Sequence, residues 1–322
     1  MRTKFTTRAL RLGATLLVVA LGTAAHATTV LYAVGQAFAP GHGHDTGNYL
    51  WSIDITNGEA TQIAPIASGI SGLGMAPDGT LYGRSGLSLY TVDRSNAALN
   101  LIGSAPSGSA TSLEIMPDGR AFVLPFNADF ETNQLHTLDL ATGAQVPVGS
   151  ATSLLDAIDL AFPNRDMTYG PFVISLGSVG NYLYGMDLET NTLIEIDPDT
   201  GDAEAKGDFD AARMETADGY WSGFAGLTGA DTDGDGFNDA LYGIANYYYD
   251  FNTQTSSARG AIGLFDLETS TWSLVGENEG VIFYSLASGN VTAPIPEPTT
   301  LALLGLGGAF LALRERRRTR KA

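Results

Sequence analysis

The chain has 322 residues, no cysteine, and 35 acidic residues against 17 basic ones. Four of the 17 basic residues lie before residue 28 and six lie after residue 298, while 34 of the 35 acidic residues lie between, which gives that stretch a net charge near −27. Such a surface repels phosphate backbones and excludes nucleic-acid binding as the function. Without disulfides, an exported domain of this size depends on its hydrophobic core and hydrogen bonds.

Residues 1–27 have the pattern of a secretory signal peptide. Basic residues precede an apolar run at 12–21, and Ala25-His26-Ala27 ends the segment as an A-x-A cleavage site. The apolar run has about 10 residues, half of the roughly 20 that a membrane-spanning helix needs. We therefore predict export and a mature chain that begins at Thr28, with an uncleaved N-terminal anchor as the alternative.

A Gly- and Pro-rich loop after the first predicted strand contains His42-Gly43-His44-Asp45. Two His and one Asp can ligate Zn²⁺ or another transition metal. A solvated loop is the more economical explanation of these residues, because the rest of the body offers one further His, His136, and no Cys.

Residues 28–292 alternate short β-type runs with turns rich in Gly, Asp, Asn and Pro, and two phrases recur. The first is an apolar or aromatic run that ends in Asp before a Thr- or Asn-rich turn, at Asp54, Asp93, Asp139, Asp197 and Asp266. The second is a hairpin with Pro-Asp-Gly at its turn (77–79 and 117–119), whose second strand reads Leu-Tyr-Gly at 81–83, 183–185 and 241–243. Each unit then has the four antiparallel strands of a β-propeller blade. The repeated Asp is expected to accept hydrogen bonds from turn amides.

The ends of this body predict how a ring would close. Residues 30–33 read as a second strand with no first strand before them, and residues 282–286 read as a first strand with no second after them. Pairing the two would complete one shared blade. We therefore predict an all-β fold, a β-propeller of five blades, with six blades or a β-sandwich as alternatives. The pattern is similar to propeller repeats of the kelch, NHL and quinoprotein-like kind, without a full match to any signature.

Residues 231–239, Asp-Thr-Asp-Gly-Asp-Gly-Phe-Asn-Asp, are the most chemically informative segment. Carboxylates at positions 1, 3, 5 and 9, with Gly at position 6, can surround a hard cation with oxygen atoms. Position 12 is Tyr242, where an EF-hand has Glu, and predicted strands flank the loop. The segment instead resembles the calcium loop of FG-GAP repeats, which joins two strands of a blade. That resemblance implies a calcium ion held by Asp231, Asp233, Asp235, Asp239 and the Phe237 carbonyl; an acidic solvated turn is the alternative.

Tyr247, Tyr248 and Tyr249, with Tyr220 and Trp221 upstream, form an aromatic concentration that we expect near this hairpin. Exposed rings can stack on sugars, whereas burial between blades is the simpler explanation. The sequence contains no nucleophile motif and no phosphate loop. Paired carboxylates for glycoside hydrolysis would leave no sequence signature.

Residues 293–322 have three parts in a fixed order: Pro296-Glu297-Pro298, an apolar stretch at 301–313, and a basic cluster interrupted by Glu315. Together they resemble the PEP-CTERM sorting signal of Gram-negative bacteria that make extracellular polysaccharide. The resemblance implies an exosortase that recognises Pro-Glu-Pro and removes the tail, after transient inner-membrane anchoring through a short transmembrane segment. A plain C-terminal membrane anchor is the alternative, and both place the body outside the cytoplasm.

Two functions remain open. The first is a non-catalytic protein of the outer surface or extracellular matrix that binds exopolysaccharide or a neighbouring surface protein, with one structural calcium. The second is an exported hydrolase or lyase that acts on polysaccharide or small substrates at the axial pocket of the propeller. The absence of a catalytic signature favours the first.

Overall fold

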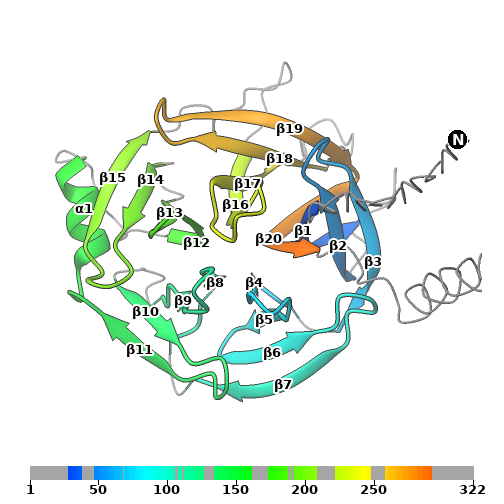
Figure 1. Ribbon diagram of the computed structural model, residues 1–322, viewed down its shortest axis with the longest axis horizontal. Coiled ribbons are helices and arrows are strands. Elements are labelled where there is room, and N and C mark those ends of the chain that lie inside the picture. Colours follow the sequence, from blue (N-terminus) through cyan, green and yellow to red (C-terminus); the bar gives the residue numbers. More distant parts are fainter. Residues whose placement is uncertain are drawn as a thin grey trace, which may run out of the picture.

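The computed structural model describes residues 28–37, 47–67, 69–105, 108–110, 112–126, 134–161, 173–187, 190, 192–208, 222–247 and 258–291. Within these ranges the strands form five four-stranded sheets, which stand around a common axis like the blades of a propeller (Figure 1). The predicted five-bladed propeller is confirmed, and the alternatives of six blades or a sandwich are wrong.

Each blade is an antiparallel sheet whose four strands follow one another from the axis outwards. Blade 1 has β20 (Val281–Val291), β1 (Thr28–Ala37), β2 (Asn48–Asp54) and β3 (Ala60–Ile66). Blade 2 has β4 (Gly72–Met75), β5 (Leu81–Ser85), β6 (Ser88–Val92) and β7 (Leu99–Ser104). Blade 3 has β8 (Glu114–Ile115), β9 (Ala121–Val123), β10 (Leu135–Leu138) and β11 (Gln145–Val148). Blade 4 has β12 (Val173–Val179), β13 (Tyr182–Asp187), β14 (Thr192–Ile196) and β15 (Ala203–Asp208), and blade 5 has β16 (Ser222–Ala230), β17 (Ala240–Tyr247), β18 (Arg259–Asp266) and β19 (Thr271–Glu279).

The ring closes through blade 1, as the two ends of the body predicted. Strand β20 pairs antiparallel with β1, from Thr28 opposite Val291 to Ala37 opposite Val281. A second tie joins the closing strand to blade 5, because the Asn246 side-chain amide donates to the carbonyl of Phe283 at 2.6 Å and accepts from its N–H at 2.9 Å. The first and last described strands are therefore part of the ring.

The hydrophobic core is divided into five clusters, one between each pair of neighbouring blades. Between blades 4 and 5, for example, Met186 and Leu193 pack with Leu241, Phe265 and Trp272. The remaining clusters join blades 1 and 5, 1 and 2, 3 and 4, and 2 and 3. A sheet that buries both faces in this way requires apolar residues at successive strand positions, which is why the strands read as apolar runs.

The repeated turns have the structural role that the sequence predicted. In each copy a carboxylate oxygen of the repeated Asp accepts a hydrogen bond from the backbone N–H two residues later, as Asp54 does from Thr56 at 2.8 Å and Asp266 from Glu268 at 2.9 Å. The Pro-Asp-Gly turns join the first and second strands of blades 2 and 3. Their glycines, Gly79 and Gly119, have φ of 84° and 87°, a conformation that disfavours residues with a side chain.

These turns define two faces of the ring. The turns between first and second strands and between third and fourth strands lie at one end of the blades, which we name the loop face. The connections between second and third strands and between blades lie at the other end, which we name the opposite face.

One helix, α1 (Ser153–Ala161), was not predicted. It lies on the outside of the ring beside β15, and its Leu154 and Ile158 enter the cluster between blades 3 and 4 (Figure 1). Their i, i+4 spacing puts both side chains on one face of the helix. Among the described residues no helix is long and apolar enough to cross a membrane, and the predicted signal peptide and sorting tail lie outside those residues.

Candidate functional site

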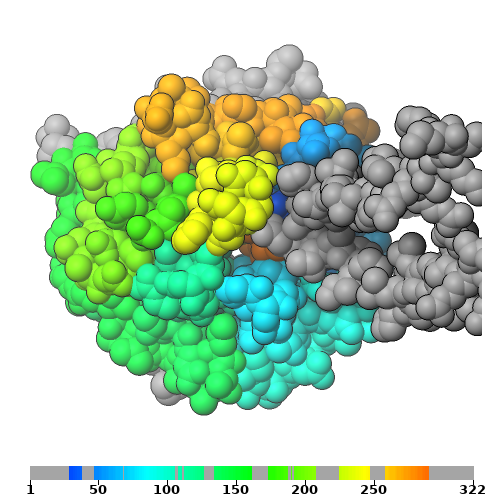
Figure 2. Space-filling view, viewed as in Figure 1, coloured from blue at the N-terminus to red at the C-terminus, as the bar shows by residue number. Residues whose placement is uncertain are grey.

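The acidic loop at residues 231–239 joins the first and second strands of blade 5, on the loop face. The Asp239 N–H donates to the carbonyl of Ala230 at 2.9 Å and closes the loop where the two strands separate. Figure 2 shows this loop, in yellow, over the middle of the ring beside the cyan and green turns of blades 2 and 3. The loop therefore occupies the place that the Pro-Asp-Gly turns take in their own blades, as the sequence predicted.

Asp231 organises the loop from its buried position. The residue is 6% exposed, one carboxylate oxygen accepts the Gly234 N–H at 2.6 Å, and the other accepts the Gly236 N–H at 2.9 Å. Both glycines have positive φ, 83° and 93°, which lets the backbone turn around the carboxylate. The Thr29 hydroxyl of β1 donates to the Asp231 carbonyl, which attaches the loop to the closing blade.

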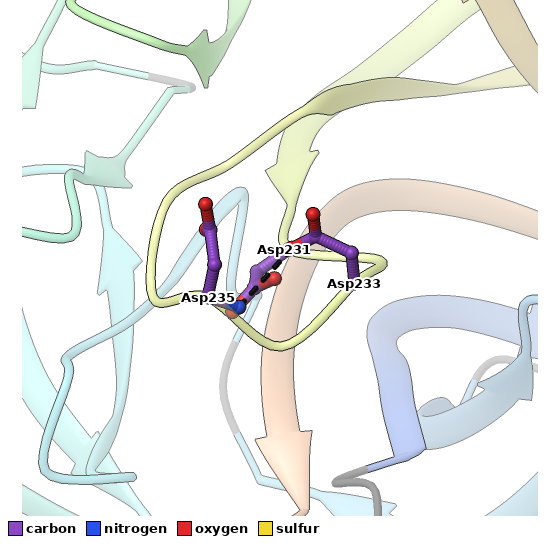
Figure 3. Close-up of side chains that lie close together, drawn as sticks. All are labelled: Asp231, Asp233 and Asp235. Atoms are coloured by element: carbon purple, nitrogen blue, oxygen red, sulfur yellow. Dashed lines mark hydrogen bonds between the residues drawn. The ribbon is translucent and has the colours of Figure 1, made fainter.

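Three of the four predicted carboxylate ligands come together. One oxygen from each of Asp231, Asp233 and Asp235 lies within 4.8 Å of the others, and in the close-up Asp231 lies between the other two (Figure 3). Three negative charges at this spacing repel one another, and a hard divalent cation is the group that carboxylate oxygens would best hold there. The three carboxylates would therefore suit a hard divalent cation such as calcium.

The fourth predicted carboxylate ligand, Asp239, lies outside this group of three. The Asp239 carboxylate accepts hydrogen bonds from the Thr232 N–H at 2.8 Å and from the Thr232 hydroxyl, and it is not part of the cluster of three. The Phe237 side chain is 60% exposed, while its N–H donates to Asp235 at 2.8 Å.

A buried acid that sequence reasoning missed lies near the axis. Glu114 of β8 is 3% exposed, and its carboxyl accepts a hydrogen bond from the Ser178 hydroxyl of blade 4 at 2.5 Å. Ser178 in turn accepts from the Asn238 side chain of the acidic loop at 2.8 Å. Burial outweighs the hydrogen bonds that Glu114 receives and raises its pKa to about 8, so the carboxyl is protonated at neutral pH. This chain of contacts connects blades 3, 4 and 5.

Blades 4 and 5 approach each other closely at Gly229, next to the same network. A Cβ added there would collide with the carbonyl oxygen of Ser178 and lie 2.6 Å from the Asn238 amide nitrogen. Gly229 therefore allows the inner strands of blades 4 and 5 to meet backbone to backbone.

The axis itself leaves little open space. A cavity of about 10 Å³ lies between the inner strands of all five blades, with a lining of Gly, Ala, Ser and Leu residues. A larger cavity of about 240 Å³ opens on the loop face between the Pro-Asp-Gly turns, β20 and the acidic loop. Met75, Met116 and Pro117 are among its apolar lining residues, and Asp231 is the one ionisable residue that the structure describes in that lining. Glu114 does not line it.

The turns of the loop face are strongly acidic. Among the described residues of these turns, the basic ones are Arg94 and Arg120, and Arg120 pairs with Asp118 at 2.6 Å. The acidic residues of the same turns are Asp54, Glu59, Asp78, Asp93, Asp118, Asp139, Asp197, Asp199, Asp202, Asp231, Asp233, Asp235, Asp239, Asp266 and Glu268.

Of the predicted aromatic group, the structure describes Tyr247, which lies at the other end of blade 5. The backbone of Tyr247 ends β17 opposite Ser222, at the end of the hairpin farthest from the acidic loop. Tyr247 therefore belongs to the hairpin that carries the acidic loop, but it lies about eight strand residues, or roughly 25 Å, from the loop itself. Trp221, Tyr248 and Tyr249 lie outside the described residues, as do His42, His44 and Pro296-Glu297-Pro298.

Comparison with protein families identifies residues 294–318 as a PEP-CTERM protein-sorting motif. No curated protein matches the chain. Among solved structures the chain is similar to one in a nidogen/laminin complex, with 11% identity, coverage of 82% of this chain and 100% of that chain, and a TM-score of 0.45. It is also similar to a putative 6-phosphogluconolactonase from Bacteroides fragilis, with 12% identity, coverage of 81% and 98%, and a TM-score of 0.39. A third is the calcium-binding protein regucalcin from Agrobacterium tumefaciens, with 15% identity, coverage of 72% and 81%, and a TM-score of 0.36. These structural likenesses carry no argument about ligand or activity. The sorting motif is informative about location and processing. It indicates an exported protein whose tail implies processing by an exosortase.

Proposed function

We propose that this protein is a non-catalytic component of the outer surface or extracellular matrix of a Gram-negative bacterium. After its tail is removed by an exosortase, it binds exopolysaccharide or a neighbouring surface protein. A calcium ion in the acidic loop stiffens the hairpin of blade 5 and the loop face around it.

The lining of the 240 Å³ cavity beside the acidic loop supports binding over catalysis. Acid–base chemistry on a glycan needs two carboxyl groups that both reach the substrate. Asp231 is the one ionisable group described in the lining of the 240 Å³ cavity, so that lining offers no pair of carboxyl groups. Glu114, the acid with the raised pKa, is 3% exposed and lies outside that lining.

The test measures binding and turnover on the same sample. The mature protein is mixed with exopolysaccharide purified from the producing strain, with a neutral glucan as the matched control polymer. We expect the protein to co-sediment with the exopolysaccharide and not with the glucan, without release of reducing or unsaturated ends. Release of such ends would replace the proposal with the hydrolase or lyase alternative, and failure to bind would remove polysaccharide as the partner.

The calcium site is tested by calorimetry of the mature protein in calcium and then in chelator. A ligand at about one hundred times its Kd stabilises a fold by about 2.7 kcal/mol, a shift of several degrees in Tm for a domain of this size. We expect this shift in the wild type and in Asp202→Ala, a control in an exposed turn of blade 4, and its loss in Asp233→Ala. A wild-type Tm that is the same in calcium and in chelator would reduce the loop to a charged turn.

A further inference from the structure

Both ends of the propeller leave the ring from the loop face. Thr28, where β1 begins, pairs with Val291, where β20 ends. The neighbouring Thr29 donates to the carbonyl of Asp231, and Gly289 lines the 240 Å³ cavity together with Asp231. The chain therefore enters and leaves the ring beside the acidic loop.

The sorting motif follows this exit after very few residues. It begins at residue 294, three residues beyond the end of β20. An extended chain spans at most about 3.5 Å per residue, so Pro296 lies within roughly 18 Å of Val291 and Leu301 within roughly 35 Å. A protease that cuts at Pro-Glu-Pro must therefore come within roughly 18 Å of Val291 on the loop face. The opposite face lies farther from the cleavage site, by the length of a blade.

The charge of the loop face favours a protein partner over a lipid surface. The acidic residues of the loop-face turns greatly outnumber Arg94 and Arg120, and most of their carboxylates are exposed. Such a face is repelled by anionic headgroups and is complementary to a basic protein surface.

We propose that the loop face is the surface on which the membrane-embedded sorting protease docks, through a basic surface of that protease, while the precursor is anchored by its tail. The proposal rests on the exosortase processing of the proposed function. It leaves the opposite face, with the end of β17 at Tyr247, free to meet partners while the precursor is still anchored.

The chain suits a test by site-specific crosslinking because it has no cysteine of its own. Two exposed turn residues of blade 2 form a matched pair at the two ends of β5: Asp78 on the loop face and Leu87 on the opposite face. Full-length Asp78→Cys and Leu87→Cys precursors, each with wild-type melting, are labelled with a short photo-crosslinker. They are then illuminated in membranes that contain a tagged, catalytically inactive exosortase.

We expect the Asp78→Cys precursor to crosslink to the exosortase at least about fivefold more than Leu87→Cys, because roughly 20 Å of blade separates the two sites. A chain that ends at residue 292 should give background crosslinking at both positions. Equal or greater crosslinking from Leu87→Cys, or crosslinking of Asp78→Cys to lipid in place of the protease, would overturn the docking surface. If the active exosortase leaves the wild-type precursor uncut, the processing itself fails, and the docking proposal fails with it.

Discussion

The buried acid Glu114 makes the folded protein less stable as the pH rises from about 4.5 to about 8. Its pKa is about 8 in the folded chain and about 4.5 when unfolded. Between these values the folded state holds a proton that the unfolded state has released, so stability falls as pH rises from about 4.5 to about 8 and then levels off. A difference of this size corresponds to roughly 4–5 kcal/mol from this one group.

Glu114→Gln removes the titration and keeps the shape and hydrogen-bonding capacity of the protonated carboxyl. We expect the variant to match the wild type within about 1 kcal/mol at pH 5 and to be more stable by several kcal/mol at pH 9. The measurement is urea unfolding of the mature protein at five pH values from 5 to 9. Glu268→Gln is the control, since Glu268 is an exposed acid in a turn of blade 5.

Parallel stability profiles for the wild type and Glu114→Gln across this range would show that Glu114 does not hold its proton in the folded state. They would mean that Glu114 is solvated or paired in solution, and that the contacts from Ser178 and Gly229 do not enclose it as the structure shows.

Two further substitutions test how the blades meet, by urea unfolding at pH 6. Gly229→Ala should destabilise the fold by about 3 kcal/mol, because the added methyl meets the backbone of the neighbouring blade. The control Gly69→Ala should be nearly neutral, because no atom lies within 4 Å of its added Cβ. Equal destabilisation by the two variants would contradict the close approach of the blades at Gly229. Asn246→Ala should lower the free energy of unfolding by about 2–3 kcal/mol, because it leaves the N–H and carbonyl of Phe283 unpaired in the core. The control is Asn100→Ala, at an exposed position. An equal loss of stability in the two variants would show that Asn246 does not hold the closing strand.

The blade repeat could be predicted because its chemistry is local. An Asp at a strand end binds turn amides two residues on, and Pro-Asp-Gly needs a glycine with positive φ, so both leave a fixed pattern in the sequence. The closure followed from the same pattern, since a lone second strand at 30–33 and a lone first strand at 282–286 needed each other.

The candidate site could be predicted only in part, for a physical reason. Its three clustered acids lie within five residues of one loop, and their alternate positions in the sequence indicate a shared site. Asp239 departs from the pattern because Thr232 offers its carboxylate two hydrogen-bond donors. Glu114 was missed because its partner Ser178 comes from another blade, although an acid in the apolar run at 113–116 was the available signal.

The sequence placed the aromatic residues near the hairpin of the acidic loop, but it does not reveal at which of the two ends of that hairpin Tyr247 lies. The two ends of a hairpin strand lie close in sequence and far apart in space. Strand β17 carries the chain from the acidic loop to Tyr247 across the full height of the blade.

If this protein is an exported propeller, its tail should direct its sorting and then be removed. Intact-mass measurement of the protein recovered from the cell surface or matrix of the producing strain tests it most directly. We expect one mature species that begins at Thr28 and has lost the apolar and basic residues beyond Pro298. A surface species that keeps residues 299–322, or protein found only inside the cell, would contradict it.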